Sequence, residues 1–425
     1  MPAFAGEARV IASCAGVHDL RTVEYPGSIV TQPDAEIREN LEKVLLDRII
    51  EALTKPVESS STLSTTKNPE EIVFEGTLEE VNEFFYEKGW TDGPPIIPPT
   101  VEKVEEFLKY TDRSPDEEIV VLPPANLGAT PRNIAVNAVM AGCRPECFPL
   151  LIAAVEAIGE PDFQLMNLGT TGATTPWLLV NGPIVKQLGI EYGVGLASRG
   201  PNTIIGRAFH LIVRNVAGFR PAETLMGTFG YMPAFVLAED EEACDEIGWE
   251  PYHMEHGFNR DASTVTARAT WNWGHVISGA RDAKAEPIPI LNEICAPQGL
   301  IAVPIAPGFG PRNMFTVLIT PPIAKVLADG GYSKRDVAEY VWENIRVPRR
   351  EVRMVSPARE NQESVFRLPE RFANAGPDEM IPVYAAASPE VIDVVVCGNP
   401  SGDKLMNLWC VYHRPVTKEI KLPAG

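Results

Sequence analysis

The chain has 425 residues, of which 45% are apolar and 22% charged, as in an ordinary globular protein rather than a disordered one. Its 57 acidic side chains outnumber its 37 basic ones, and the formal net charge of −20 would repel the phosphates of nucleic acids. We therefore expect a folded protein whose partners are small molecules or other proteins.

The cysteine content and the hydropathy indicate a cytoplasmic protein. Seven cysteines are an odd number, and their scatter along the chain favours reduced thiols over a disulfide framework. The chain does not open with a basic segment followed by an apolar run, and no window approaches the roughly 20 apolar residues that span a bilayer. We expect neither secretion nor membrane insertion.

The first 55 residues are expected to form a small unit of their own. Apolar residues recur at helical spacing through 34–54 and predict an amphipathic helix, at Ile37, Leu41, Val44, Leu45, Ile49 and Leu53. Residues 56–75 begin with a polar stretch that has no apolar period, which is typical of a linker. We divide the rest of the chain into two α/β halves, 76–235 and 236–425.

Helices and strands are predicted to alternate in the first half. Thr77 followed by Glu80 fits a capping box at the start of a helix that stops at Gly89. Further expected elements are two helices within 133–158 that are broken at 142–145, a buried strand at 177–180, and a helix at 202–216 with Asn202 as its cap.

The second half is predicted to begin with a loop-rich region and to continue with strands and one clear helix. The loop-rich region is 235–275, the strands are 299–305, 314–319 and 391–397, and the helix is 333–345. The last strand is apolar except at Asp393, which suits a strand covered on both faces. We therefore expect an α/β fold with mixed sheets flanked by helices.

An internal similarity suggests two pseudo-repeated halves. Residues 178–188 match residues 317–327 at a constant offset of 139, and each copy places a buried strand before a proline that begins a helix. Any two turns of this type look alike, so chance similarity is the competing interpretation. The fold class is the same in either case.

Cys143 and Cys147, with Glu146 between them, are the strongest local candidate for reactive thiols, because two thiols and a carboxylate lie close in sequence. A helix start near these thiols would lower a thiol pKa and make it more nucleophilic. The spacing is not that of a redox dithiol, and no second cysteine pair completes a structural zinc site. The alternative is a buried thiol that packs as a small apolar group.

His253 and His256 lie three residues apart, with Glu255 between them. On a helix both imidazoles would face one side, so a transition metal bound by this pair is conceivable. Pro251 and Gly257 leave hardly one helical turn, and histidines of this kind are more often hydrogen-bonded loop residues.

Two other sets of residues could bind a substrate. Arg207, His210 and Arg214 form a basic stripe along the helix at 202–216, which could hold a carboxylate or be a solvated face. Thr170 and Thr171 belong to a loop rich in glycine and threonine whose backbone donors could approach a ligand.

Four stretches of the chain carry a family resemblance: Phe85 to Thr100, Asn137 to Glu146, Asn181 to Ile184, and Ile205 to Arg207. They resemble the large region of the UGSC family, named for a selenocysteine or cysteine, Gly, Ser, Cys motif on a separate small domain. The resemblance covers most of 75–425. Residues 17–54 resemble the tail of that small domain, so we interpret 1–55 as its remnant.

No Cys-Gly-Ser-Cys sequence occurs in these 425 residues. The resemblance therefore suggests that a separate small chain supplies the motif and completes a heteromeric active site on this subunit. Such a motif could act as a thiol redox pair, or it could hold a transition metal for hydration or lyase chemistry. The cofactor stays open between these alternatives.

The resemblance implies that this chain supplies the pocket for a small organic substrate. The residues in the resembling stretches that we expect to act are Asp92, Cys143 and Glu146 in catalysis, and Asn181 and Arg207 in substrate binding. The rival interpretation is a non-catalytic binding or scaffold subunit, which would have a large apolar surface patch in place of converging polar groups. Under either interpretation, we expect the protein to form an oligomer.

Overall fold

The computed structural model describes residues 5–6, 8–9, 12–13, 16–17, 19–27, 32–55, 71–221, 223–228, 230–271, 273, 276–278, 286–295, 314–351, 374–382, 389–410 and 413–423. The predicted strand at 299–305 lies outside these residues. Within them, no helix is long and apolar enough to cross a membrane.

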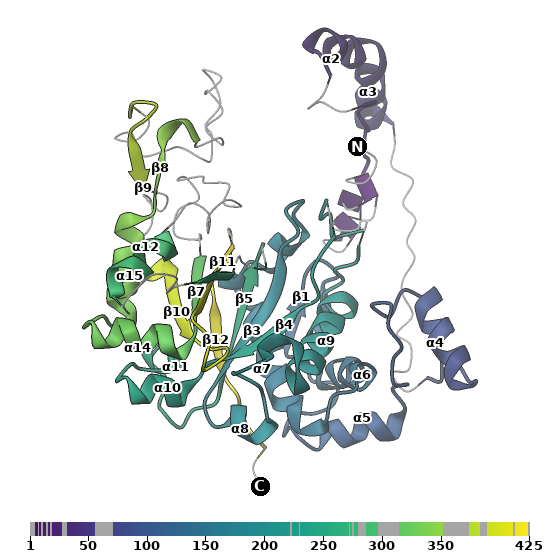
Figure 1. Ribbon diagram of the computed structural model, residues 1–425. Helices are drawn as coiled ribbons and strands as arrows, with labels where there is room; N and C mark the ends of the chain where they lie inside the picture. The colour runs from purple at the N-terminus through teal and green to yellow at the C-terminus, as the bar shows by residue number, and fades with distance from the viewer. Residues whose placement is uncertain are drawn as a thin grey trace.

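Two four-stranded mixed sheets pack face to face, and helices cover the outer face of each (Figure 1). The predicted α/β fold with mixed sheets flanked by helices is therefore confirmed. The first sheet has the order β12 (Val416–Glu419), β5 (Thr264–Thr270), β3 (Thr175–Asn181), β4 (Phe235–Ala238). The second has the order β10 (Ile392–Val396), β7 (Met314–Ile319), β11 (Lys404–Cys410), β6 (Val276–Ser278).

Both sheets use the same strand directions. β3 is parallel to β4 and antiparallel to β5, while β7 is parallel to β10 and antiparallel to β11. The outer strands are exchanged, because β6 follows β5 in the chain but pairs with β11, and β12 follows β11 but pairs with β5. The two matching sequence stretches thus occupy equivalent places, although an internal duplication remains a prediction.

The exchange of outer strands bears on the expected boundary at residue 235. That boundary falls at the start of β4, and both β5 and β12 come from the part of the chain after it. A division there would cut through the first sheet. The region 235–275 is also richer in regular structure than predicted, since it holds β4, β5 and the short helices α10 (Glu241–Glu246) and α11 (Tyr252–Glu255).

The burial of both faces explains why the middle of β3 is apolar at successive positions. In β3, Leu178 and Val180 join the core under the helices, while Trp177 and Leu179 join the core between the sheets. All seven residues of β3 are buried. A strand with both faces covered favours apolar residues at successive positions, as at 177–180 in β3, and its polar residues Thr175 and Asn181 stand at the two ends.

Helices of the described residues form the outer layers. The first sheet is covered by α6 (Pro131–Ala141), α7 (Phe148–Gly159) and α9 (Gly200–Asn215), and the second by α12 (Pro287–Cys295), α14 (Pro321–Asp329) and α15 (Lys334–Asn344). The predicted break between α6 and α7 is confirmed, and Gly142 ends α6 with a left-handed φ of 83°. The predicted cap of α9 is wrong: the helix begins at Gly200, and Asn202 is buried inside its first turn.

Shorter elements complete the described chain. They are α2 (Asp34–Asn40) and α3 (Leu46–Thr54) joined by a π-helical turn (Leu41–Leu45), α4 (Leu78–Glu87), α5 (Val101–Leu108), α8 (Ile184–Leu188), the hairpin of β1 (Val120–Leu122) and β2 (Leu127–Ala129), and the pair β8 (Arg346–Pro348) and β9 (Met380–Pro382). The helix expected at 34–54 is present, and α4 has the predicted capping box of Thr77 and Glu80. Short 3-10 helices lie at Pro145–Cys147, Pro161–Phe163, Leu165–Gly169, Leu196–Ser198, Arg349–Glu351 and Pro389–Val391.

Candidate functional site

Polar side chains gather where the parallel strands β3 and β4 end. Asn181 is the last residue of β3, and Glu239 directly follows β4. The carboxyl ends of parallel strands meet at one edge of a sheet, so the two side chains lie together. Glu239 Oε2 accepts hydrogen bonds from Asn181 Nδ2 at 2.9 Å and from the Tyr252 backbone N–H at 2.6 Å. Asn181 and Glu239 are almost completely buried.

A lysine from the other half of the sandwich neutralises Glu239. Lys334 is the first residue of α15, its side chain is buried, and its Nζ lies 2.8 Å from Glu239 Oε1 and 3.3 Å from Glu255 Oε2. Although burial disfavours its charge, these carboxylates raise the pKa of Lys334 above its ordinary value. The ion pair therefore ties the second helical layer to the edge of the first sheet.

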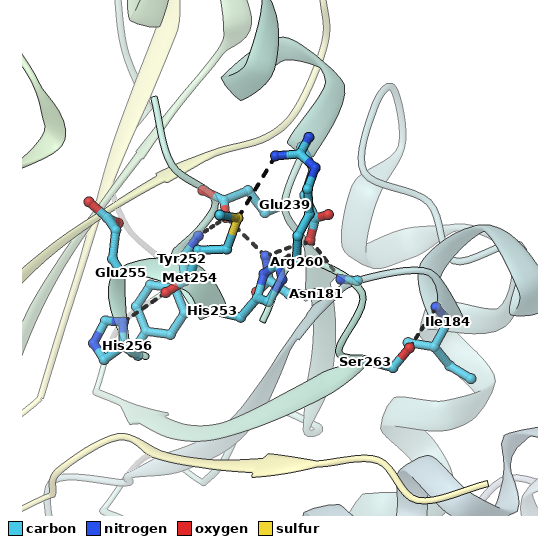
Figure 2. Close-up of polar contacts among 12 residues, drawn as sticks. Asn181, Ile184, Glu239, Tyr252, His253, Met254, Glu255, His256, Arg260 and Ser263 are labelled. Atoms are coloured by element: carbon cyan, nitrogen blue, oxygen red, sulfur yellow. Dashed lines mark hydrogen bonds and ion pairs between the residues drawn. The ribbon is translucent and has the colours of Figure 1, made fainter. Parts of the chain in front are cut away.

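Glu241 and His253 extend this group of polar residues. Glu241 Oε1 accepts hydrogen bonds from the Gly182 backbone N–H at 2.6 Å and from Asn181 Nδ2 at 3.0 Å. His253 Nδ1 lies 3.5 Å from the same oxygen. The side chain of His253, labelled in Figure 2, is completely buried. We call Asn181, Glu239, Glu241, His253, Glu255 and Lys334 the carboxyl-edge cluster.

Several buried polar atoms of this cluster have no hydrogen-bond partner among the described residues. They are both ring nitrogens of His253, which has no exposed surface, and Oδ1 of Asn181. Thr264, opposite Asn181 in the β3–β5 ladder, has a hydroxyl in the same condition. A buried polar group left without a partner costs about 1–3 kcal/mol, so such atoms point to a ligand-binding or catalytic role.

The outer side of the cluster is reached by solvent. The side chains of Glu241 and Glu255 are 25% and 30% exposed, whereas Glu239 and Lys334 are enclosed. Burial raises the pKa of Glu255 to about 7, against the opposing charge of Lys334. A carboxyl group of this kind can exchange a proton near neutral pH.

A second buried network lies between the sheets beside the cluster. Arg268 Nη2 is 2.5 Å from Asp393 Oδ2, and Arg268 Nη1 donates to the hydroxyl of Tyr252 at 3.1 Å. Tyr252 also donates its backbone N–H to Glu239, so the two networks are continuous. Desolvation and the charge of Asp393 raise the pKa of Tyr252 and keep the phenol protonated.

The two histidines predicted to bind a metal do not come together. His256 stacks on the Tyr252 ring with centroids 4.0 Å apart, and its Nδ1 lies 2.8 Å from the Tyr252 carbonyl oxygen (Figure 2). His253 faces Glu241 instead. In the part of the chain that the structure describes, no group of three or more His, Cys, Asp or Glu residues is arranged to hold a metal ion.

Asp92 and Arg207, predicted to act in catalysis and in substrate binding, pair with each other. Arg207 Nη2 lies 2.9 Å from Asp92 Oδ1, and Nε lies 3.0 Å from Oδ2, which is a bidentate ion pair. Arg207 also donates to the Pro94 carbonyl oxygen at 2.8 Å. Arg207 thus binds a carboxylate, but that carboxylate belongs to the protein and fixes the loop at 90–95 on α9.

His210 lies one turn after Arg207 on α9. Burial lowers the pKa of His210, and the charges of Arg214 and Arg207 act in the same direction against that of Asp92. A neutral imidazole contributes no positive charge to the basic stripe. The binding of a substrate carboxylate by the stripe of Arg207, His210 and Arg214 remains a prediction.

The expectation of a lowered thiol pKa at Cys143 and Cys147 is wrong. Burial raises the pKa of Cys143 well above its ordinary value, and burial raises that of Cys147 to about 11. The short 3-10 helix between α6 and α7 does not outweigh the loss of solvation. Glu146 is exposed and accepts a hydrogen bond of 3.4 Å from the Tyr110 hydroxyl.

Thr170 and Thr171 lie at the opposite end of the first sheet from the cluster. They precede β3, whose far end is Asn181, so about 20 Å of strand separates them from it. Thr170 Oγ1 contacts Thr174 Oγ1 at 3.2 Å, and the Thr171 carbonyl oxygen accepts from Thr228. Their predicted role in substrate binding is therefore separate from the cluster.

Glu239, Glu241 and Lys334 were not predicted from the sequence. A signal for the first two was present, because an acidic run follows the apolar strand at 235–238 directly. Lys334 had no such signal, since a lysine after a serine helix cap is usually a solvated surface residue.

Comparison with known proteins gave no match: no family model, no curated protein and no solved structure is similar to this chain.

Proposed function

We propose that this chain is a subunit of an enzyme that transforms a small organic molecule by general acid–base chemistry at the carboxyl-edge cluster. The observation that carries the proposal is His253, which is fully buried beside Glu241 while neither ring nitrogen has a hydrogen-bond partner among the described residues. Buried His413 differs from it in one ring nitrogen: its Nδ1 lies 2.8 Å from the Phe163 carbonyl oxygen, and only its Nε2 has no partner among the described residues. A purely structural histidine is expected to resemble His413.

Each residue of the pair has a defined chemical role in this proposal. Glu241 orients the protonated Nδ1 of His253, which leaves Nε2 as the base. The Nδ1–Oε1 distance of 3.5 Å is long, and such contacts commonly shorten when substrate binds. Oδ1 of Asn181 is free to accept a hydrogen bond from a substrate hydroxyl or amine.

The buried ion pair of Lys334 and Glu239 holds Asn181 of this site in place. Lys334 compensates the charge of Glu239, and Glu239 in turn holds Asn181 Nδ2 at 2.9 Å. With Nδ2 fixed, Oδ1 of Asn181 has a defined direction. The ion pair therefore positions the side chain that would contact the substrate.

The family resemblance adds a partner to the proposal. A separate small chain carrying a cysteine or selenocysteine, Gly, Ser, Cys motif would dock on this subunit and contribute thiol redox chemistry or a transition metal for hydration or lyase chemistry. The resembling stretches and the lack of that motif in the 425 residues support this part. In this arrangement the present chain supplies acid–base groups and the substrate pocket.

Hydrogen exchange at carbon tests the proposed chemistry across a range of possible substrates. A panel of hydroxy, keto and unsaturated carboxylic acids would be incubated with the protein in D2O and followed by proton NMR. We expect exchange or addition of water for at least one compound, and a rate at least ~100-fold slower for Glu241→Gln, the lower end of what acid–base groups contribute. The matched control is Glu242→Gln, because Glu242 is 62% exposed on the same helix.

Two results would decide against the proposal. A folded Glu241→Gln variant as active as Glu242→Gln would remove the pair from the chemistry. An inactive wild-type protein that remains inactive when co-purified with its native partners, while still binding them, would favour the scaffold interpretation.

A further inference from the structure

The helix α3 has an apolar face that nothing in the described chain covers. Four of its apolar residues, Leu46, Ile49, Ile50 and Leu53, are spaced as i, i+3, i+4 and i+7, so they share one face. Their exposed fractions are 53%, 37%, 50% and 80%. This is the anchor pattern of an amphipathic helix that binds in an apolar groove.

The same chain has a groove of suitable character next to α4. It encloses about 630 Å³ and is bordered by α4, α5, the first half of α6 and the extended segment 71–76. Most of its lining is apolar, including Val81, Phe85, Pro98, Val104 and Val136. Further apolar side chains on its border are exposed, namely Ile72, Val73, Phe74, Leu78 and Val101.

Within one chain, the apolar face of α3 does not occupy the groove beside α4, so both surfaces are exposed. Figure 1 shows α3 far from α4 and α5, at the other end of the molecule. Sixteen residues, 55–70, connect the end of α3 to the beginning of the groove wall, a length that can span at most about 55 Å. This connection is long enough for α3 to reach a neighbouring molecule.

We propose that α3 of one copy of this chain docks in the groove of a second copy, and that the exchange is reciprocal. A reciprocal exchange uses each surface once in each chain and closes with twofold symmetry, the commonest symmetry of homo-oligomers. A single partner, the second copy, then covers both the apolar face of α3 and the groove. Otherwise two unrelated partners would be needed to cover these two surfaces. The proposal does not depend on the carboxyl-edge cluster.

The molecular mass of the full chain in solution tests this proposal. Light scattering after size exclusion should give twice the chain mass for the wild-type protein. Ile50→Asp on the helix and Val101→Asp on the groove each place a charge in the apolar contact, so each should weaken dimerisation at least ~100-fold and give a monomer. Leu127→Asp on β2 is the matched control, because Leu127 is 48% exposed and outside both surfaces, and it should remain dimeric.

A mixture of the two variants distinguishes helix-in-groove exchange from other dimers. The Ile50→Asp chain keeps an intact groove and the Val101→Asp chain keeps an intact helix, so equimolar mixing should restore a heterodimer through one intact contact. A monomeric wild-type protein would overturn the proposal, as would a dimer that withstands either substitution or a mixture that stays monomeric. Circular dichroism of both exposed-site variants confirms that they are folded.

Discussion

Replacing Lys334 by methionine should destabilise the protein far more than a typical lysine substitution. The change removes the cation 2.8 Å from Glu239 and keeps a side chain of similar length, so the carboxylate remains buried without its partner. Breaking a buried ion pair by removing one member costs about 3–5 kcal/mol. Glu239 keeps hydrogen bonds from Asn181, Tyr252 and Val396, so we expect a loss of about 3 kcal/mol, at the lower end of this range.

Urea unfolding monitored by circular dichroism measures this loss, with Lys325→Met as the matched control. Lys325 pairs with Asp329 on α14, but both side chains are 64% exposed, so we expect a change within ~0.5 kcal/mol. The double variant Lys334→Met with Glu239→Gln removes both charges and should recover part of the stability. If Lys334→Met costs no more than Lys325→Met, the buried ion pair does not stabilise the fold as argued.

Three further predictions concern other buried groups. Arg207→Ala should cost about 1–3 kcal/mol and increase proteolysis at 90–95, because Asp92 loses its bidentate partner; unchanged proteolysis would contradict this. Desolvation lowers the pKa of His413 to about 4 from 6.5, so the folded state binds fewer protons, and stability should fall by up to ~3 kcal/mol as pH drops from 6.5 to 4; a His413→Gln variant with the same pH slope would refute the assignment. Cys143 and Cys147, whose pKa values burial raises, should react with iodoacetamide at pH 8 at least ~10-fold more slowly in the folded protein than in urea, as peptide mass spectrometry would show.

Local sequence signals predicted the individual elements well. Thr77 and Glu80 marked a helix start, and the apolar runs in β3, β7 and β10 marked strands, because capping and hydropathy patterns depend on residues close in sequence. The exchange of β6 and β12 between the sheets had no such signal. Each is only three or four residues long, and its place depends on pairing with strands more than a hundred residues away.

The candidate site was harder to predict for the same reason. Glu239 and Lys334 are 95 residues apart, and only Glu239 had a local signal, the acidic run after the strand at 235–238. Their burial follows from the packing of α15 beside the carboxyl end of β4. The prediction of a lowered thiol pKa at Cys143 was wrong for the opposite reason. A local sequence pattern was present and suggested a thiol at a helix start, but burial in the tertiary structure raises the pKa.

The most direct test of the proposed acid–base site compares His253→Gln with His256→Gln in the reaction found by deuterium exchange. The two histidines are three residues apart, but only His253 is buried beside Glu241, whereas His256 packs on the Tyr252 ring. We predict that kcat/KM falls at least ~100-fold for His253→Gln and stays within about threefold for His256→Gln, with both variants folded. Equal activity of the two variants would contradict a catalytic role for His253.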